Sequence, residues 1–404
     1  MGSKSKRFWA VARKNLWYAI VIALCFSALS ALFFSSGGVS NLAELLKSLG
    51  IGWLLGALFC VVCYWFLECF VTHIYTLVVY KRIKLRFSLY VGMMGLFYSA
   101  LTPFSMGGQP MQVMAMRKSG MDTGPATSII ALKTIIYSIV LTLYSLLVIL
   151  FKMPFFISNV SNFSFLAIIG FLINGVFVFL LLLFSLNRSV AFRLIKACIN
   201  LLAKVRIVKN PEERIRSTEN QVQLFRDSIK LTNKMPMAQL LATGLTFLQF
   251  TAYFLIPYCL YRSFGFKGAS VVNMVSAQSF VTMVSNFVPL PGGSGGAEGS
   301  FLLFFRIFFP EGSLVSVMFL WRLISYYLTM IVGGLVALFG ARWVRKHYGY
   351  HQTSVTNGEP LMRDVVPGAP FPQAGSLSSV QTEDTSVSPD ATEDPPPPRH
   401  IDDP

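Results

Sequence analysis

Charged side chains are scarce in this 404-residue chain, where Asp, Glu, Lys and Arg together make up 13% of the sequence. A soluble domain usually carries about a quarter. Histidine is rarer still, with four residues, and most of the six cysteines lie inside apolar runs. Cys60 and Cys63 form one C-x-x-C pair, but neither a second pair nor a nearby histidine completes a metal site. We therefore expect a chain that is not a soluble domain and that holds no metal and no cofactor.

Signatures of nucleotide and nucleic-acid binding are also missing. No G-x-x-x-x-G-K-[ST] segment occurs in the sequence, so we do not expect ATP to drive an activity. The formal net charge is +16. The basic residues of the chain lie beside the apolar runs, where they would face anionic lipid. Nucleic-acid binding is therefore not expected.

Long apolar runs are abundant, and 54% of the residues are hydrophobic. A run of ~20 residues crosses the ~30 Å hydrocarbon core of a bilayer as a helix. The pattern predicts an all-α polytopic membrane protein with about six full transmembrane helices plus two opposed re-entrant hairpins in an inverted repeat. The full spans are expected at 17–34, 51–80, 126–151, 165–186, 239–261 and 314–341. The alternative for the first run, a cleaved signal peptide, rests on the small residues of "ALSA", but the long membrane chain that follows favours an uncleaved span.

Two further apolar runs, 89–116 and 270–309, are interrupted by "TPFSMGGQP" and "PLPGGSGGAEGSF". If each run returns to the face from which it entered, most Lys and Arg residues fall on the cytoplasmic side. This arrangement predicts a multi-pass protein of the cell membrane with both termini in the cytoplasm. The two interrupted runs then enter from opposite faces, which is an inverted repeat of the kind common in transporters.

The domain organisation follows from these runs. Residues 1–16 form a basic cytoplasmic N-terminus, and 17–186 the first membrane half with the hairpin 89–116. Residues 187–238 form a basic cytoplasmic connector, expected to be an amphipathic helix on the membrane surface or a solvated segment packed on the bundle. The second membrane half is 239–346 with the hairpin 270–309, and 347–404 is an acidic Pro/Ser/Thr-rich tail that we expect to be disordered.

The interruptions predict a substrate site. Irregular backbone at membrane depth survives only inside protein or against a water-filled cavity. Helix N-termini at such tips favour an anionic group, and glycine allows a head group to approach the backbone closely. The alternative is that the glycines only permit tight helix crossing. The candidate substrate-binding residues of the tips are Gly107, Gly108, Gln109, Gly292, Gly293, Ser294, Gly295, Gly296 and Glu298.

Two cations inside the spans are further candidates for substrate binding. Lys133 and Arg322 each follow a hairpin by a similar distance, and a cation at that depth usually faces the bundle interior or a cavity. One hypothesis is that they receive a lipid phosphate in turn, at either end of its path. The alternative pairs Lys133 with Glu68 and Arg322 with Glu298 as structural ion pairs. Glu298 could equally contact an ammonium group or carry a proton, and His73 is expected to make a polar contact between helices.

The two interruptions, together with "RKSG" after the first, resemble the lysylphosphatidylglycerol synthase transmembrane family. That family includes UPF0104-type proteins and the flippase domain of the multiple peptide resistance factor, which is linked to antibiotic resistance. The resemblance implies a lipid flippase that moves aminoacylated phosphatidylglycerol or another phospholipid between leaflets. Gln109 and Pro110 stand after the first glycine pair, where the family is associated with an acidic residue. No soluble aminoacyltransferase domain follows the last span, so we do not expect aminoacyl-lipid synthesis.

The predicted function is therefore transport of an anionic phospholipid, with that lipid and the surrounding membrane as partners. A homo-oligomer and a separate lipid-modifying enzyme stay open as further partners. Two alternatives remain: a membrane component of lysylphosphatidylglycerol synthesis, and an intramembrane serine hydrolase with Ser294 in G-x-S-x-G as nucleophile. The hydrolase needs a general base within reach. The histidines after Ser294 fall beyond the last span.

Overall fold

The computed structural model describes residues 49–80, 83–159, 227–286, 288–310 and 312–347, with isolated positions between 172 and 225. Residues 1–16, the expected span at 17–34, most of the expected span at 165–186, most of the connector and the tail after 347 lie outside the described residues. Within the described ranges the chain is helical and contains no strand. This confirms the expectation of a helical protein.

Among the described residues, four helices are long and apolar enough to cross a membrane: Ile51–Val79, Thr123–Lys152, Pro236–Ser263 and Leu314–Gly340. The first is α3, Ile51–Val79, and the third is α10, Pro236–Ser263. The second belongs to α6, Thr123–Asn159, which continues eight residues past the expected end of its span. The fourth joins α13 (Leu314–Arg322) to α14 (Leu328–His347) through the π-helical turn Leu323–Tyr327. Such π turns frequently mark functional sites, and this one begins directly after Arg322.

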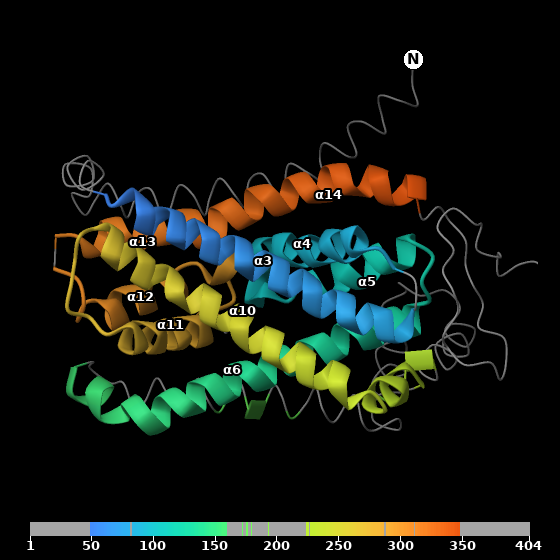
Figure 1. Cartoon of the computed structure of the whole chain (residues 1–404), viewed down its shortest axis with the longest axis horizontal. Coiled ribbons are helices and arrows are strands. Elements are labelled where there is room, and N and C mark those ends of the chain that lie inside the picture. Colours follow the sequence, from blue (N-terminus) through green and yellow to red (C-terminus); the bar gives the residue numbers. More distant parts are fainter. Residues whose placement is uncertain are drawn as a thin grey trace, which may run out of the picture.

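Each interrupted run folds into two short helices joined by a tip. The first pair is α4 (Leu85–Leu101) and α5 (Gly108–Lys118), joined through the 3-10 turn η1 (Pro103–Ser105). The second is α11 (Val271–Ser285) and α12 (Gly296–Phe305), joined through η2 (Pro291–Gly293). Figure 1 shows the pairs extending from opposite ends of the bundle, and η1 contacts η2.

The 3-10 turns of the two tips share a run of positive φ angles, although the two residues after each turn differ in conformation. Each 3-10 turn begins with a proline, and two residues with positive φ follow: Phe104 (55°) and Ser105 (54°) in one tip, Gly292 (61°) and Gly293 (64°) in the other. In both tips the next helix begins at the second glycine of a Gly-Gly pair. Positive φ is uncommon for residues other than glycine. The first tip adopts positive φ at two residues with side chains, so the two tips share the same kind of turn.

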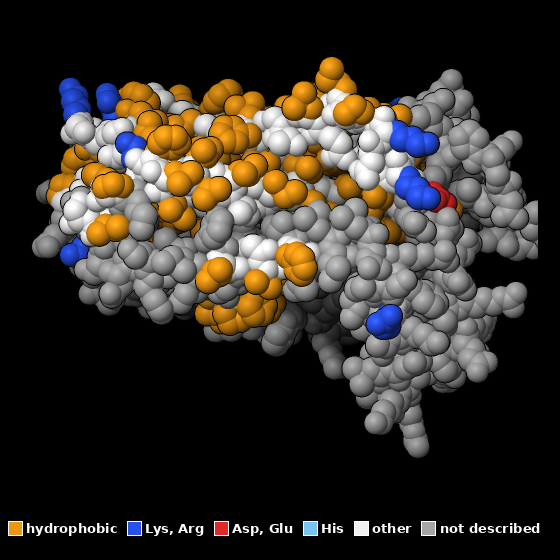
Figure 2. Space-filling view, turned by 90° about the horizontal axis from the view of Figure 1, so that it is seen from below, with side chains coloured by type: hydrophobic (Ala, Val, Ile, Leu, Met, Phe, Trp, Pro, Cys, Tyr) orange, Lys and Arg blue, Asp and Glu red, His pale blue; other side chains and the backbone are white. Residues whose placement is uncertain are grey.

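The bundle exposes much of its apolar surface. α3 packs against α10, and α14 packs against α4, while their outward faces carry residues such as Phe59 (68% exposed) and Leu338 (62%). Figure 2 shows hydrophobic side chains across the middle of one face and basic side chains toward its two ends. A soluble monomer rarely exposes so large a contiguous apolar surface, and this one suits contact with a bilayer.

Candidate functional site

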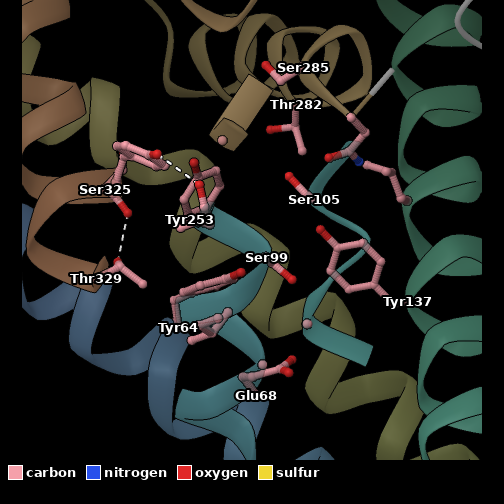
Figure 3. A pocket seen from close by; sticks show the side chains of 18 of the residues that line it. Tyr64, Glu68, Ser99, Ser105, Tyr137, Tyr253, Thr282, Ser285, Ser325 and Thr329 are labelled. Atoms are coloured by element: carbon pink, nitrogen blue, oxygen red, sulfur yellow. Dashed lines mark hydrogen bonds between the residues drawn. The ribbon is translucent and has the colours of Figure 1, made fainter. Parts of the chain in front are cut away.

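A cavity of about 270 Å³ lies where the two tips meet. Both helical pairs, both tips and the long helices α3, α6, α10 and α13–α14 contribute to its wall. The lining is rich in hydroxyl, amide and aromatic side chains. Figure 3 shows the hydroxyl-bearing residues Tyr64, Ser99, Ser105, Tyr137, Tyr253, Thr282, Ser285, Ser325 and Thr329 around this space.

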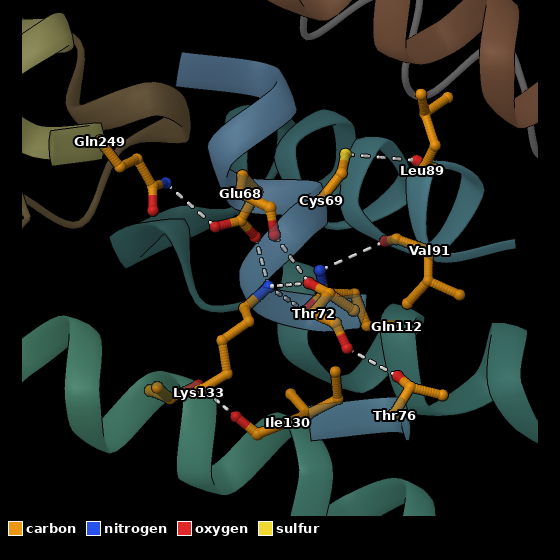
Figure 4. Close-up of polar contacts among 11 residues, drawn as sticks. Glu68, Cys69, Thr72, Thr76, Leu89, Val91, Gln112, Ile130, Lys133 and Gln249 are labelled. Atoms are coloured by element: carbon orange, nitrogen blue, oxygen red, sulfur yellow. Dashed lines mark hydrogen bonds and ion pairs between the residues drawn. The ribbon is translucent and has the colours of Figure 1, made fainter. Parts of the chain in front are cut away.

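One side of the cavity holds an ion pair between Glu68 of α3 and Lys133 of α6 (Figure 4). The Lys133 Nζ also donates to Thr72 Oγ1 and to Gln112 Oε1, each at 3.3 Å. The second carboxylate oxygen of Glu68 accepts a hydrogen bond of 3.1 Å from Gln249 Nε2. All five side chains are buried. The ammonium therefore has three polar partners and both carboxylate oxygens are occupied, which is the condition for a buried pair to be tolerated.

The other side holds an ion pair between Arg322 of α13 and Glu298 of α12. Arg322 Nε donates to Glu298 Oε1 at 2.7 Å, and Nη1 donates to the carbonyl oxygen of Gly292 at 3.4 Å. The other oxygen of Glu298 accepts from the backbone N–H of Gly295 at 2.6 Å, which caps α12. The guanidinium carbon lies 5.1 Å and 5.2 Å from the ring centroids of Trp321 and Tyr326. These contacts fix the plane of the guanidinium against the second tip.

Several buried polar atoms in this wall have no hydrogen-bond partner among the residues that the structure describes. They are Gln109 Oε1, both amide atoms of Gln278, Trp321 Nε1 and Arg322 Nη2. All four residues line the cavity, and Gln278, Trp321 and Arg322 are at most 4% exposed. Leaving such a group unpaired costs about 1–3 kcal/mol, and more for a charged one. Their gathering around one cavity therefore favours a polar ligand there.

The structure brings most of the predicted site residues to this region. Six line the cavity: Glu68, Gly108, Gln109, Lys133, Gly292 and Arg322. Glu298 lies beside the cavity, where it contacts Arg322. Five residues of the tips are not part of the cavity lining: Gly107, Gly293, Ser294, Gly295 and Gly296. His73 lies away from the cavity wall, with its Nδ1 3.0 Å from Ser88 Oγ of α4. Both predicted ion pairs are present, and both reach the same cavity.

Protein atoms lie close to Gly293 and Gly296 of the second tip. A Cβ on Gly293 would lie 2.5 Å from the carbonyl oxygen of Ser285, and one on Gly296 would lie 2.0 Å from Val288 Cγ2. These two glycines let the tip fold closely against its own hairpin, because protein atoms occupy the space where a side chain would lie. Gly292 does line the cavity, and there a Cβ would meet the ring of Tyr326 at 2.1 Å.

Ser294 has a local role in the described structure. Its Oγ donates to the carbonyl oxygen of Pro291 at 2.8 Å, within the same tip. The ring of His73, the histidine within α3, contacts Ser88 of α4. The hydroxyl thus closes the turn that precedes α12.

Sequence reasoning missed the buried amides of the site. Gln112, Gln249 and Gln278 are at most 2% exposed, and they come from α5, α10 and α11. Each is a polar residue within or beside an apolar run, and such residues usually face a bundle interior. That rule could have identified all three before the structure was known.

Comparison with known proteins places these features in context. The family model for the lysylphosphatidylglycerol synthase TM region matches residues 16–333, a range that includes every side chain of the cavity wall. A UPF0104 membrane protein of Archaeoglobus fulgidus is 29% identical over 262 residues. The alignment covers 63% of this chain and 76% of that relative.

Proposed function

Because this chain belongs to the lysylphosphatidylglycerol synthase transmembrane family, a membrane family connected with lipid handling, we propose that it moves an anionic phospholipid between leaflets. The observation that carries this proposal is the polar cavity between the two tips, with a buried ion pair on either side. A lipid head group cannot cross hydrocarbon without losing its hydration, and a polar cavity replaces that hydration with protein groups. The acyl chains would remain in the bilayer.

The transport path requires that both tips reach the interior of the membrane. With 17 residues, α4 is ~25 Å long, and α11, with 15 residues, is ~22 Å, both below the ~30 Å of hydrocarbon. We propose that each pair is a re-entrant hairpin, the first entering from the cytoplasm and the second from outside. A head group leaving either face would then meet a tip near the middle of the bilayer.

Cysteine accessibility tests these hairpins. In a background without the native cysteines, Arg86→Cys and Lys118→Cys mark the two ends of the first hairpin, and Lys267→Cys and Arg306→Cys mark those of the second. All four positions are exposed. We expect a membrane-impermeant maleimide to label the first two only from the cytoplasmic side and the last two only from outside. Labelling of the two ends of one hairpin from opposite sides would show that the hairpin crosses the membrane.

Reconstitution tests the function itself. Purified protein in vesicles with a trace of acyl-chain-labelled fluorescent phosphatidylglycerol should make the inner-leaflet label accessible to dithionite, with or without an imposed membrane potential. Empty vesicles should lose only their outer-leaflet label. Protein-containing vesicles that behave like empty ones would contradict the proposal.

Ser294→Ala is the matched variant for the hydrolase alternative. Its Oγ bonds only within the tip in the described structure, so the variant should retain the wild-type rate. Loss of activity in this variant, together with fluorophosphonate labelling of the wild type, would favour the hydrolase.

Mass spectrometry of the same vesicles tests lysylphosphatidylglycerol synthesis, because an enzyme would produce new aminoacylated lipid when given an aminoacyl donor.

A further inference from the structure

We infer that the cavity selects a phosphodiester head group with an uncharged polyhydroxyl moiety, such as glycerol, and discriminates against its aminoacylated form. The inference rests on the proposed function, since it names the lipid class that the same cavity would take. It depends on which charges in the wall are already neutralised and on which polar atoms still lack a partner.

The phosphate belongs at the Arg322 side of the cavity. Arg322 uses Nε for Glu298 and Nη1 for Gly292, which leaves the N–H groups of Nη2 without a partner among the described residues. Trp321 Nε1 and Gln278 Nε2 are also buried and without a partner in the described part of the chain, and both residues line the same space. A charged guanidinium edge with two neutral N–H donors matches the oxygens of a phosphodiester.

The Lys133 side has no such capacity. Its ammonium is engaged by Glu68, Thr72 and Gln112, and the second oxygen of Glu68 is engaged by Gln249. A phosphate there would have to displace a partner of a buried pair and leave a carboxylate without compensation. The two ion pairs are thus alike in charge but different in the donors they offer.

No carboxylate in the described wall is available for an ammonium group. Among the described residues, Glu68 lines the cavity and Glu298 lies beside it against Arg322, and each carboxylate already forms an ion pair with a buried cation. A lysyl ester of the head group would bring two ammonium groups into this space. Without a free carboxylate, those charges would lose their hydration uncompensated.

The remaining wall suits hydroxyl groups. Ser99, Ser105, Tyr137 and Thr282 surround the cavity with hydroxyls that can both donate and accept (Figure 3). Gln109 Oε1 is a buried acceptor with no partner among the described side chains. A glycerol hydroxyl would supply the missing donor, whereas a carboxylate at position 109 would create an ammonium site instead.

Two labelled lipids of equal chain length, phosphatidylglycerol and lysylphosphatidylglycerol, test this selection in the vesicle assay. We expect wild-type protein to move phosphatidylglycerol at least about tenfold faster, because an unpaired buried charge readily costs the equivalent of a factor of ten. Gln109→Glu should reverse the preference, and Gln109→Asn is its uncharged control. Equal rates in the wild type, or a preference that Gln109→Glu leaves unchanged, would overturn the inference.

Binding in detergent micelles, measured by native mass spectrometry, separates the inference from transport. Phosphatidylglycerol should compete out lysylphosphatidylglycerol, and Gln278→Leu should weaken binding of phosphatidylglycerol. Soluble glycerol 3-phosphate at the same concentration should not bind, because the acyl chains contribute to the affinity of the lipid. If neither lipid moves in vesicles but the binding preference holds, the transport proposal fails while the site survives. If lysylphosphatidylglycerol binds as well or better, the inference fails whatever the transport result.

Discussion

Lipid movement should be lost in the double variant Arg322→Met with Glu298→Gln, although this variant should fold as the wild type does. Both charges of the buried pair disappear together, so no unpaired charge remains. What is lost is a guanidinium in the cavity wall whose Nη2 is buried and has no partner among the described residues. A hydrogen bond to a charged group contributes about 1.5–3 kcal/mol, so we expect the transport rate to fall roughly 10- to 100-fold.

Single substitutions refine this expectation. Arg322→Met alone leaves Glu298 buried without its cation, which costs about 3–5 kcal/mol and risks the fold. Arg322→Lys can keep the ion pair, but an ammonium lacks the planar fork that holds Glu298 on one edge and a phosphate on the other. We therefore expect Arg322→Lys to be folded, by circular dichroism and size-exclusion chromatography, and slow in transport.

The matched control is Lys133→Met with Glu68→Gln, which removes the other buried pair. The Lys133 ammonium is satisfied by protein groups, so its role is expected to be structural and this variant should keep most of the transport rate. Loss of transport in both double variants, with both proteins folded, would favour the hypothesis that Lys133 and Arg322 bind phosphate in turn. If both double variants keep the wild-type transport rate, the hypothesis that Arg322 binds the phosphate is wrong.

The long helices were predictable from the sequence because span length and apolar composition are local properties. The runs at 51–80 and 239–261 became α3 and α10 with ends shifted by no more than three residues. The interruptions could also be located, since Gly and Pro clusters cannot continue a helix. The sequence also allowed two ion pairs to be proposed as one of two alternatives, Lys133 with Glu68 and Arg322 with Glu298, because a charge at that depth needs a partner.

The contacts between residues far apart in the sequence could not be predicted. Gln249 reaches Glu68 across 181 positions of the chain, and Tyr326 reaches the carbonyl oxygen of Ala100 across 226. Such contacts depend on the packing of α3, α10 and α14, which no local pattern specifies. The positive φ angles of Phe104 and Ser105 were hidden for another reason, because residues with side chains give no signal for that conformation.

Alkylation of a single cavity residue tests most directly whether the head group passes between the tips. Thr282 of α11 lines the cavity and is 9% exposed. In a background without the native cysteines, Thr282→Cys should transport lipid until N-ethylmaleimide is added, and then fall to the rate of empty vesicles. Lys118→Cys, at the exposed end of α5, is alkylated in parallel and should keep its rate. Fully alkylated Thr282→Cys protein that still moves phosphatidylglycerol at its unmodified rate would contradict a path through this cavity.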